Sequence, residues 1–338
     1  MKAVGYRNSL PIDDPDALLD LELPAPSPAG RELLVEVKAI AVNPVDTKVR
    51  RGVAPPDGEA KVLGWDVVGT VRAAGPDARL FKPGDRVWYA GAIDRPGANA
   101  ELHVVDERIV ALAPRTLGDA EAAALPLTAI TAWELLFDRL GVPRGGGQGD
   151  TLLVVGAAGG VGSILVQLAR RLTALTVVGT ASRTETAEWV RELGAHHVVD
   201  HAKPLDAEFE RHGLEAPRYI ASLTQTGQHF EALATLVAPQ GRIGLIDDPA
   251  TDAIDIGKLK RKSVSLHWEF MFTRSLFQTA DIAAQHALLD EVARRVDDGT
   301  LRSTLGEHYG TINAANLRRA HAHVESGKAR GKIVLEGF

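Results

Sequence analysis

Apolar residues follow two different patterns along this chain, and the change falls near residue 119. Before it, short segments alternate apolar and polar residues, as where Val35 and Val37 alternate with Glu36 and Lys38. This period of two is typical of half-buried strands, and Gly and Pro separate the segments. Strands are expected near residues 2–6, 32–42, 62–71, 86–89, 98–105 and 109–112. Many short strands with such turns predict a β-barrel or a β-sandwich.

From residue 119 the pattern becomes helical and then alternates. A helix is expected to begin at residue 119, capped by Asp119, and to continue after Pro126. Strands are then expected near 151–156, 175–180, 196–200, 218–223, 241–246 and 264–270, and helices near 161–172, 184–193 and 227–237. This alternation is typical of a parallel, doubly wound sheet.

The last part of the chain does not extend this alternation. A long helix is expected near 278–297, a short strand near Thr300, a helix near 313–326 and a final strand at 332–335. These elements are expected to return to the first domain. The fold class predicted is therefore α/β, with a β-rich domain formed by residues 1–124 and 273–338. Residues 125–272 are expected to form a Rossmann-type domain.

A glycine-rich turn follows the first strand of the alternation. Gly159 would let the backbone approach a pyrophosphate, and Gly162 would let the helix pack closely on the strand. Ala157 replaces the first glycine of the G-x-G-x-x-G fingerprint, so the pattern is incomplete. It predicts either a dinucleotide site at a helix N-terminus or a tight strand–helix turn without a ligand. The expected phosphate-binding residues are Gly159, Gly160, Val161 and Gly162.

The end of the second strand distinguishes NAD from NADP. NAD-binding folds place an acidic residue there, about 20 residues past the glycines, to bind the ribose hydroxyls. Here the strand ends in Ser182 and Arg183, and no acidic residue stands between residues 175 and 183. A hydroxyl and a guanidinium suit a 2′-phosphate, whereas the alternative is a solvated arginine beside a helix start. The sequence therefore predicts NADPH.

Composition excludes several classes of protein. The 338 residues carry a net charge of −6, and 45% of them are hydrophobic, so nothing indicates a nucleic-acid partner. The absence of cysteine excludes disulfides, thiolate metal sites and cysteine nucleophiles. The N-terminus does not read as a signal peptide, and no apolar run reaches membrane-spanning length. A cytoplasmic protein without a membrane partner is expected.

Several local motifs resemble one family. They are residues 43–50 (NPVDTKVR), 64–69 (GWDVVG), 82–87 (KPGDRV), 125–132 (LPLTAITA) and 157–162 (AAGGVG). Together with the domain order, they resemble the zinc-free quinone oxidoreductase branch of the medium-chain dehydrogenase/reductase superfamily, and within it the bacterial zinc-type alcohol dehydrogenase-like proteins. The resemblance covers nearly the whole chain and implies a GroES-like catalytic domain beside the Rossmann domain.

The resemblance also implies positions for cofactor and substrate. Cofactor contacts are expected from Asn43, Thr128, Thr224, Ile246 and Lys332, and a 2′-phosphate contact from His201. Asn43 is also the expected catalytic donor to a developing oxyanion, assisted by Thr131 or Tyr89, whereas Asp46 is expected to be structural. The expected pocket walls are Trp65, Trp88, Phe270 and Phe272, although aromatic residues are also ordinary core residues.

The resemblance to zinc alcohol dehydrogenases does not extend to their metal ligands. The positions of their cysteine, histidine and second cysteine ligands hold Asn43, Trp65 and about Ala124 here, none of which suits zinc. His196 and His197, like His321 and His323, are spaced so that each pair does not share a face. No metal site is therefore expected.

The function predicted is zinc-independent hydride transfer from NADPH to a quinone or conjugated enone. The alternatives are a 2-alkenal or enoyl double-bond reductase and a non-catalytic NADPH-binding protein; a zinc alcohol dehydrogenase is a poor third. Residues 264–272 read as an apolar edge strand. Because the resemblance implies pairing of this edge across a two-fold axis, a homodimer is expected.

Overall fold

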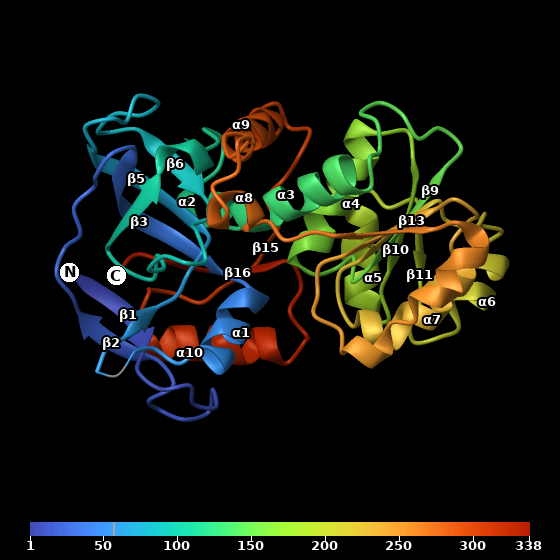
Figure 1. The fold of residues 1–338 in the computed structure, drawn as a ribbon, viewed down its shortest axis with the longest axis horizontal. Coiled ribbons are helices and arrows are strands. Elements are labelled where there is room, and N and C mark those ends of the chain that lie inside the picture. The colour runs from blue at the N-terminus through green and yellow to red at the C-terminus, as the bar shows by residue number, and fades with distance from the viewer. Residues whose placement is uncertain (57) are drawn as a thin grey trace. The chain divides into compact units, whose positions relative to one another are not determined.

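The computed structural model describes residues 1–56 and 58–338 and divides the chain into two compact units. The first unit contains Met1–Ile130 and Phe272–Phe338, and the second contains Thr131–Met271. The division from the sequence was placed after residues 124 and 272. The first unit is β-rich and the second is built on a parallel sheet, so the predicted fold class is confirmed (Figure 1).

The first unit is built around one long strand, β3 (Glu32–Val42), whose side chains alternate between buried and half-buried positions. One edge of β3 pairs with β5, and its other edge pairs first with β7 and then with β16. The seven-stranded sheet runs β15-β16-β3-β5-β6-β8 with β7 beside β3, and a second sheet runs β2-β1-β4. The other strands are β1 (Lys2–Tyr6), β2 (Leu19–Glu22), β4 (Lys61–Val62), β5 (Val67–Ala74), β6 (Arg86–Tyr89), β7 (Leu102–Asp106), β8 (Val110–Leu112), β15 (Leu305–His308) and β16 (Lys332–Glu336).

Several details of this unit differ from the prediction, and one of them is strand β2, which was not expected. Helix α1 (Pro44–Gly52) was not expected. The N-cap of α2 is Gly118, one residue before the predicted Asp119. The long helix begins only at Ala284, because α8 and a turn come first, and the strand expected near Thr300 lies at β15. The helices are α1, α2 (Asp119–Ala123), α8 (Thr273–Leu276), α9 (Ala284–Asp297), α10 (Ala314–Glu325) and the 3-10 turn η1 (Glu107–Ile109).

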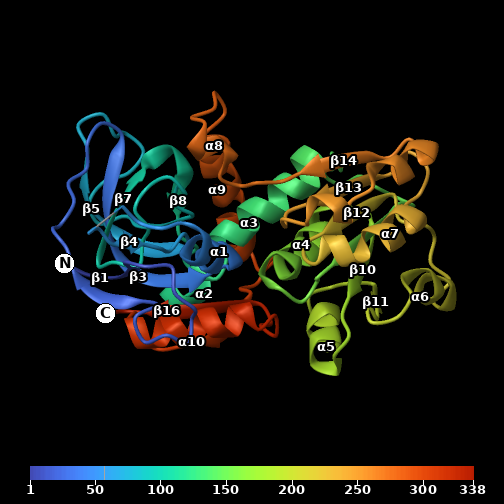
Figure 2. The ribbon, with the colours of Figure 1, turned by 60° about the horizontal axis from the view of Figure 1, so that its bottom comes forward.

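The second unit is a six-stranded parallel sheet in the order β11-β10-β9-β12-β13-β14. Strand β9 (Thr151–Val155) is buried at every position, because helices cover both faces of the sheet. Helices α4 and α5 lie on one face and α6 and α7 on the other (Figures 1 and 2). Helix α6 (Leu205–Arg211) was missed in the sequence.

The remaining strands and helices of this unit follow the predicted alternation, whereas its 3-10 segments were not predicted. They are the strands β10 (Thr176–Thr180), β11 (His197–Val199), β12 (Tyr219–Ser222), β13 (Arg242–Leu245) and β14 (Ser265–Trp268), the helices α4 (Gly160–Leu172), α5 (Thr184–Glu192) and α7 (Thr226–Leu236), and the 3-10 segments η3 (Thr251–Ala253) and η4 (Ile256–Lys262).

The boundary in the sequence between the two units falls within one continuous helical stretch. Helix α3 (Pro126–Trp133) continues into a π-helical stretch, Glu134–Arg139. Within the described residues, Asp119–Arg139 is long and apolar enough to cross a membrane, which corrects the expectation that no segment is. Of its most apolar window, 83% is buried inside the protein, as in the core helix of a globular protein.

Candidate functional site

The glycine-rich turn lies where the strand order of the second unit reverses, between the carboxyl ends of β9 and β12. Open α/β sheets bind ligands at this switch point. Gly156 adopts a φ of +80°, which favours glycine. A Cβ on Gly162 would lie 2.4 Å from the Gly156 carbonyl oxygen, so this residue provides the expected close packing of α4 on β9. A Cβ on Gly159 would meet only that same oxygen, at 3.5 Å, which leaves room beside the helix N-terminus.

The end of β10 lies next to this turn. The Gly156 amide donates a hydrogen bond to Thr180 Oγ1 at 3.1 Å, which joins the two segments. Ser182 and Arg183 follow directly and are exposed. Arg183 Nη1 lies 3.3 Å from Glu185 Oε1, with side chains 43% and 64% exposed. Ion pairs this exposed contribute little, so the guanidinium can exchange Glu185 for a phosphate.

His201 follows the neighbouring strand β11, and its ring lies near that of His229 on α7. The rings of His201 and His229 are 6.0 Å apart between centroids, at an edge-to-face angle. His201 Nδ1 is buried and has no hydrogen-bond partner among the described residues. Burial, and then the neighbouring His201, lower the pKa of His229. The predicted contact of His201 with a 2′-phosphate stays a prediction.

The other predicted residues of this unit lie at the same sheet edge. Thr224 follows β12, and its methyl carbon would be 2.8 Å from a Cβ on Gly156. Ile246 follows β13 and is half-buried. The structure thus brings the glycine turn, Thr180, Ser182 and Thr224 to the carboxyl edge of one sheet.

The first unit contains a buried polar cluster formed by Asn43, Asp46, Asp66 and Lys332. The antiparallel register of β16 with β3 pairs Ile333 with Val42, which brings Lys332 beside Asn43. Lys332 Nζ donates to Asp66 Oδ2 at 3.0 Å, to the Val42 carbonyl oxygen at 3.0 Å and to Asn43 Oδ1. The side chains of Lys332 and Asp66 are 3% and 0% exposed. This is a fully buried ion pair.

Asp66 is the centre of this cluster. It accepts hydrogen bonds from Asn43 Nδ2 at 2.8 Å and from the Leu127 amide at 2.7 Å, in addition to Lys332. Three donors favour the carboxylate form, although burial raises the pKa of Asp66. Asp66 lies within residues 64–69, one of the motifs that resemble the family, and this motif is the only signal for Asp66 that the sequence carries.

Asp46 is the second buried carboxyl group of the cluster. Its Oδ2 accepts a hydrogen bond from the Asn43 amide at 2.8 Å, which caps the first turn of α1 and agrees with a structural role. Burial raises the pKa of Asp46 to about 7, opposed by the Asn43 hydrogen bond and the Lys332 charge. The cluster thus has one ammonium for two carboxyl groups, and burial raises the pKa of both.

These contacts change the reading of three predicted cofactor residues. Both polar ends of the Asn43 side chain are engaged, since its Oδ1 faces Lys332 and its Nδ2 faces Asp66. The second hydrogen of Nδ2 points to the Ala41 carbonyl oxygen at 3.4 Å, so Asn43 could donate it to an oxyanion by giving up only this long bond. The Lys332 ammonium is likewise buried in the ion pair, and Thr128 Oγ1 donates to the Leu125 carbonyl oxygen at 3.0 Å. All three side chains make internal contacts of the first unit, and their expected contacts with a cofactor stay predictions.

The predicted pocket walls are mostly core residues. Trp65 and Trp88 are fully buried, and Trp65 packs edge-on against the buried Phe272 with centroids 6.1 Å apart. Trp65 Nε1 also donates to the Ala92 carbonyl oxygen. These three rings therefore expose no face to a ligand here, because each fills the interior of the first unit. Phe270, in the second unit, is 45% exposed.

Tyr89 is also buried, and its hydroxyl group donates its proton to an internal hydrogen bond. His103 Nε2 faces the Pro96 carbonyl oxygen at 3.1 Å, so this nitrogen carries the hydrogen and Nδ1 accepts. The Tyr89 hydroxyl lies 3.0 Å from Nδ1 and therefore donates to it. Burial raises the pKa of Tyr89 and lowers that of His103 to about 4. Tyr89 thus donates an internal hydrogen bond, and its assisting role stays a prediction.

The residues of this chain at the positions of the zinc ligands of alcohol dehydrogenases do not suit a metal ion. Asn43 Oδ1 accepts a hydrogen bond from an ammonium, the Trp65 indole is buried, and Ala124 has no donor atom. Across the part of the chain that the structure describes, no group of three or more His, Cys, Asp or Glu residues could hold a metal ion. No step of the chemistry is therefore assigned to zinc.

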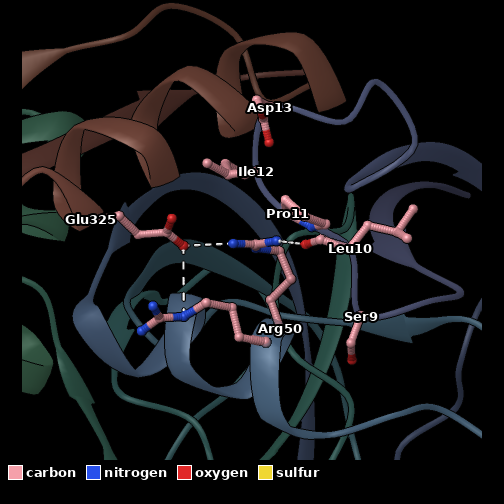
Figure 3. A pocket seen from close by; sticks show the side chains of 8 residues that line it. Ser9, Leu10, Pro11, Ile12, Asp13, Arg50 and Glu325 are labelled. Carbon is pink, nitrogen blue, oxygen red and sulfur yellow. Dashed lines mark hydrogen bonds and ion pairs between the residues drawn. The ribbon is translucent and has the colours of Figure 1, made fainter.

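A surface cavity of about 470 Å³ opens elsewhere in the first unit (Figure 3). The Arg50 guanidinium spans its floor, donating to the Leu10 carbonyl oxygen and, at 2.5 Å, to Glu325 Oε1. Arg51 Nε lies 4.0 Å from the same carboxylate. Arg50, Arg51 and Glu325 are thus paired with one another, and none of the predicted site residues lines the cavity.

Comparisons with known proteins agree with this architecture. The family model of the alcohol dehydrogenase GroES-like domain matches residues 29–115, and that of the zinc-binding dehydrogenases matches residues 193–335. A zinc-type alcohol dehydrogenase-like protein of Staphylococcus epidermidis is 37% identical over 99% of both chains. The crystal structure of a putative zinc-dependent alcohol dehydrogenase from Rhizobium etli is 59% identical, covers 100% of this chain and 98% of its own, and gives a TM-score of 0.95.

Two further solved structures are similar along 99% of both chains. One is a quinone oxidoreductase of Pseudomonas syringae, 25% identical with a TM-score of 0.83. The other is a mycobacterial protein complexed with NADPH, 29% identical with a TM-score of 0.84. A GroES-like domain joined to a nicotinamide-binding parallel sheet defines an oxidoreductase of the medium-chain dehydrogenase/reductase superfamily. The chain belongs to the zinc-type alcohol dehydrogenase-like proteins of that superfamily.

Proposed function

We propose that this protein is an NADPH-dependent quinone oxidoreductase that transfers hydride to a quinone or conjugated carbonyl compound without zinc. The observation that carries the proposal is the end of β10. There Ser182 and the exposed Arg183 lie beside the glycine turn, where an NAD-binding protein would place an acidic residue. An acidic side chain would repel a 2′-phosphate, whereas a guanidinium can bind it through two parallel hydrogen bonds.

The second unit offers a complete edge for such a cofactor. The N-terminus of α4, at Gly160, would hold the pyrophosphate with backbone N–H groups, and Gly159 leaves room for its approach. Ser182 and Arg183 would hold the 2′-phosphate. Thr224 and Ile246 would border the remainder of the cofactor, because they follow the strands on the other side of the switch point.

The chemistry follows from the missing metal ligands. Bound NADPH would supply the hydride. Alcohol oxidation in this superfamily depends on zinc to stabilise an alkoxide, and the residues here do not form that site. Quinones and enones are already electrophilic and need orientation, hydrogen bonding and a proton. Since Asn43 and Tyr89 are engaged in internal hydrogen bonds, we propose that water supplies this proton.

The related proteins support the same direction. The Pseudomonas syringae relative is a quinone oxidoreductase and the mycobacterial relative binds NADPH. Both are similar along nearly the whole chain, so their chemistry is a reasonable guide to the substrate class. We propose the cytoplasm as the site of action.

Replacing Arg183 with alanine should remove the preference for NADPH. The loss of a charge-assisted phosphate contact should raise the KM for NADPH about 10- to 100-fold and leave the KM for NADH nearly unchanged. Steady-state kinetics with both nucleotides measure this. Arg191→Ala, an exposed arginine at the far end of α5, is the matched control and should change neither value. Equal losses with both nucleotides would contradict the assignment of Arg183.

The substrate class is tested by NADPH oxidation with 9,10-phenanthrenequinone and with a 2-alkenal, each with and without a chelator. We expect chelator-resistant turnover that prefers the quinone. Turnover with the alkenal alone would identify a double-bond reductase. Tight NADPH binding without turnover on either acceptor would indicate a non-catalytic NADPH-binding protein, and loss of activity with the chelator would restore the zinc hypothesis.

We also propose a homodimer formed through β14. This strand is the edge of the parallel sheet, and Trp268 and Phe270 beside it are 54% and 45% exposed. An apolar edge strand needs a cover, and a second copy would supply it. Sedimentation at micromolar concentration should give twice the chain mass of 36.1 kDa. Trp268→Asp should give a monomer, whereas Ile256→Asp, at another exposed apolar residue, should not; a wild-type monomer would overturn the proposal.

A further inference from the structure

A hydrogen-bonded chain of three side chains joins the carboxyl ends of β12 and β13. Asp247 accepts hydrogen bonds from the Thr226 amide at 2.9 Å and from Thr226 Oγ1. Thr226 Oγ1 lies 2.8 Å from Ser222 Oγ. Because a carboxylate at this position accepts both Thr226 protons, the Ser222 hydroxyl must donate to Thr226 Oγ1. The donor and the acceptor of each hydrogen bond from Ser222 through Thr226 to Asp247 are thereby determined.

These side-chain hydrogen bonds stabilise a strained turn. Gln225, between Ser222 and Thr226, adopts the left-handed conformation with φ 50° and ψ 37°, which a residue with a side chain rarely adopts. Ser222 and Thr226 are fully buried, so water does not compete for their hydroxyl groups. Asp247 also satisfies the first amide of α7 and places a negative charge at its positive end. Strain of this kind persists only where the surroundings enforce it.

The fastened turn carries Thr224, which faces the glycine turn. The methyl group of Thr224 occupies the space into which a Cβ on Gly156 would project, so a shift of the turn changes the room at the switch point. Ile246 directly precedes Asp247 on the β13 side. One carboxylate therefore sets the positions of two cofactor-edge segments that are far apart in the sequence.

We infer that Asp247, acting through Thr226, is a positioning residue that holds Thr224 and Ile246 ready for the nicotinamide cofactor. The inference rests on the proposed function, since it assumes that NADPH binds at this edge. Without the contact, the turn leaves its strained conformation, and bound nucleotide must restore it. The apparent affinity for the nucleotide is then the intrinsic affinity multiplied by the fraction of molecules in the binding-competent conformation. The residues expected to bind the 2′-phosphate are not part of this turn, so the affinities for NADPH and NADH should fall equally.

The test compares Thr226→Val, which removes the hydroxyl group, with Thr226→Ser, which keeps it. In the full chain, Thr226→Val should raise the dissociation constant and the KM for both nucleotides about tenfold, with kcat nearly unchanged and the NADPH-to-NADH ratio preserved. Thr226→Ser should restore wild-type values. Thr235→Val is the matched control, because Thr235 lies at the far end of α7 and donates only to the Glu231 carbonyl oxygen.

A second variant protects the test against misfolding. Asp247→Asn keeps the size of the side chain but has only one oxygen to accept from Thr226, and it should weaken both nucleotides in the same way. Wild-type dissociation constants in Thr226→Val and Asp247→Asn, or a Thr226→Ser variant as weak as Thr226→Val, would overturn the inference. In either case wild-type chain still binds NADPH, whereas a wild-type chain that binds neither nucleotide overturns the proposed function and the inference with it.

Discussion

Replacing Lys332 with methionine should lower the free energy of unfolding of the first unit by about 3–5 kcal/mol, the cost of removing one partner of a buried ion pair. Asp66 would remain buried with 0% of its side chain exposed, and it would face the Asn43 amide and the Leu127 amide without a counter-ion. The methionine has about the same length, so the loss comes from the charge and its hydrogen bonds. Urea denaturation followed by tryptophan fluorescence measures it, with Trp65 and Trp88 as the tryptophans of this unit and the other three in the second unit.

Two variants control this experiment. Lys38→Met removes a lysine from an exposed pair with Glu36, whose side chains are 41% and 28% exposed, and should change the free energy by less than about 1 kcal/mol. Asp66→Asn combined with Lys332→Met removes both charges and should recover part of the loss. A Lys332→Met variant as stable as Lys38→Met would show that the pair contributes nothing to stability.

The second large effect is a pH dependence that Glu269→Gln removes. Glu269 is buried beside Glu134, and Arg139 Nε donates to its Oε2 at 2.8 Å. Burial, and then the Glu134 charge, raise the pKa of Glu269 from 4.5 to about 9, with Arg139 opposing. The folded protein therefore keeps this proton where the unfolded chain releases it. The stability that the proton provides is complete below about pH 4.5 and is lost as the pH rises towards 9.

Urea denaturation at pH 5, 7 and 9 tests this dependence. Wild-type protein should lose stability on the order of 1 kcal/mol per pH unit more than Glu269→Gln, whose amide cannot release a proton. The glutamine can still accept from Arg139 and can donate to Glu134, so the packing is kept. Glu188→Gln, at an exposed position of α5, should keep the wild-type slope. Equal slopes in wild type and Glu269→Gln would show that Glu269 is already ionised in the folded protein.

The elements that the sequence predicted well are those with a strong local period. The parallel strands and α4 stand close to their expected positions, because the strands are short apolar runs between turns and the apolar residues of α4 repeat every three to four positions. Helix α1 was missed for the opposite reason. Its buried residues include Asp46, Thr47 and Arg50, which are polar, so no apolar stripe marks the helix. Helix α6 did carry a signal, since Leu205 and Phe209 are spaced four residues apart and are buried.

The candidate site divides in the same way. The sequence by itself determined the glycine turn and the absence of an acidic residue at the end of β10, because both depend on neighbours within a few positions of the chain. Only the tertiary structure decided what Asn43, Lys332 and the aromatic residues do. The β3–β16 register brings Lys332 to Asn43 and Asp66 across almost the whole chain, and those buried charges satisfy one another. Such pairing depends on long-range strand contacts, which local periodicity does not contain, so the sequence could not show that these expected cofactor and pocket residues also contact one another in the interior of the first unit.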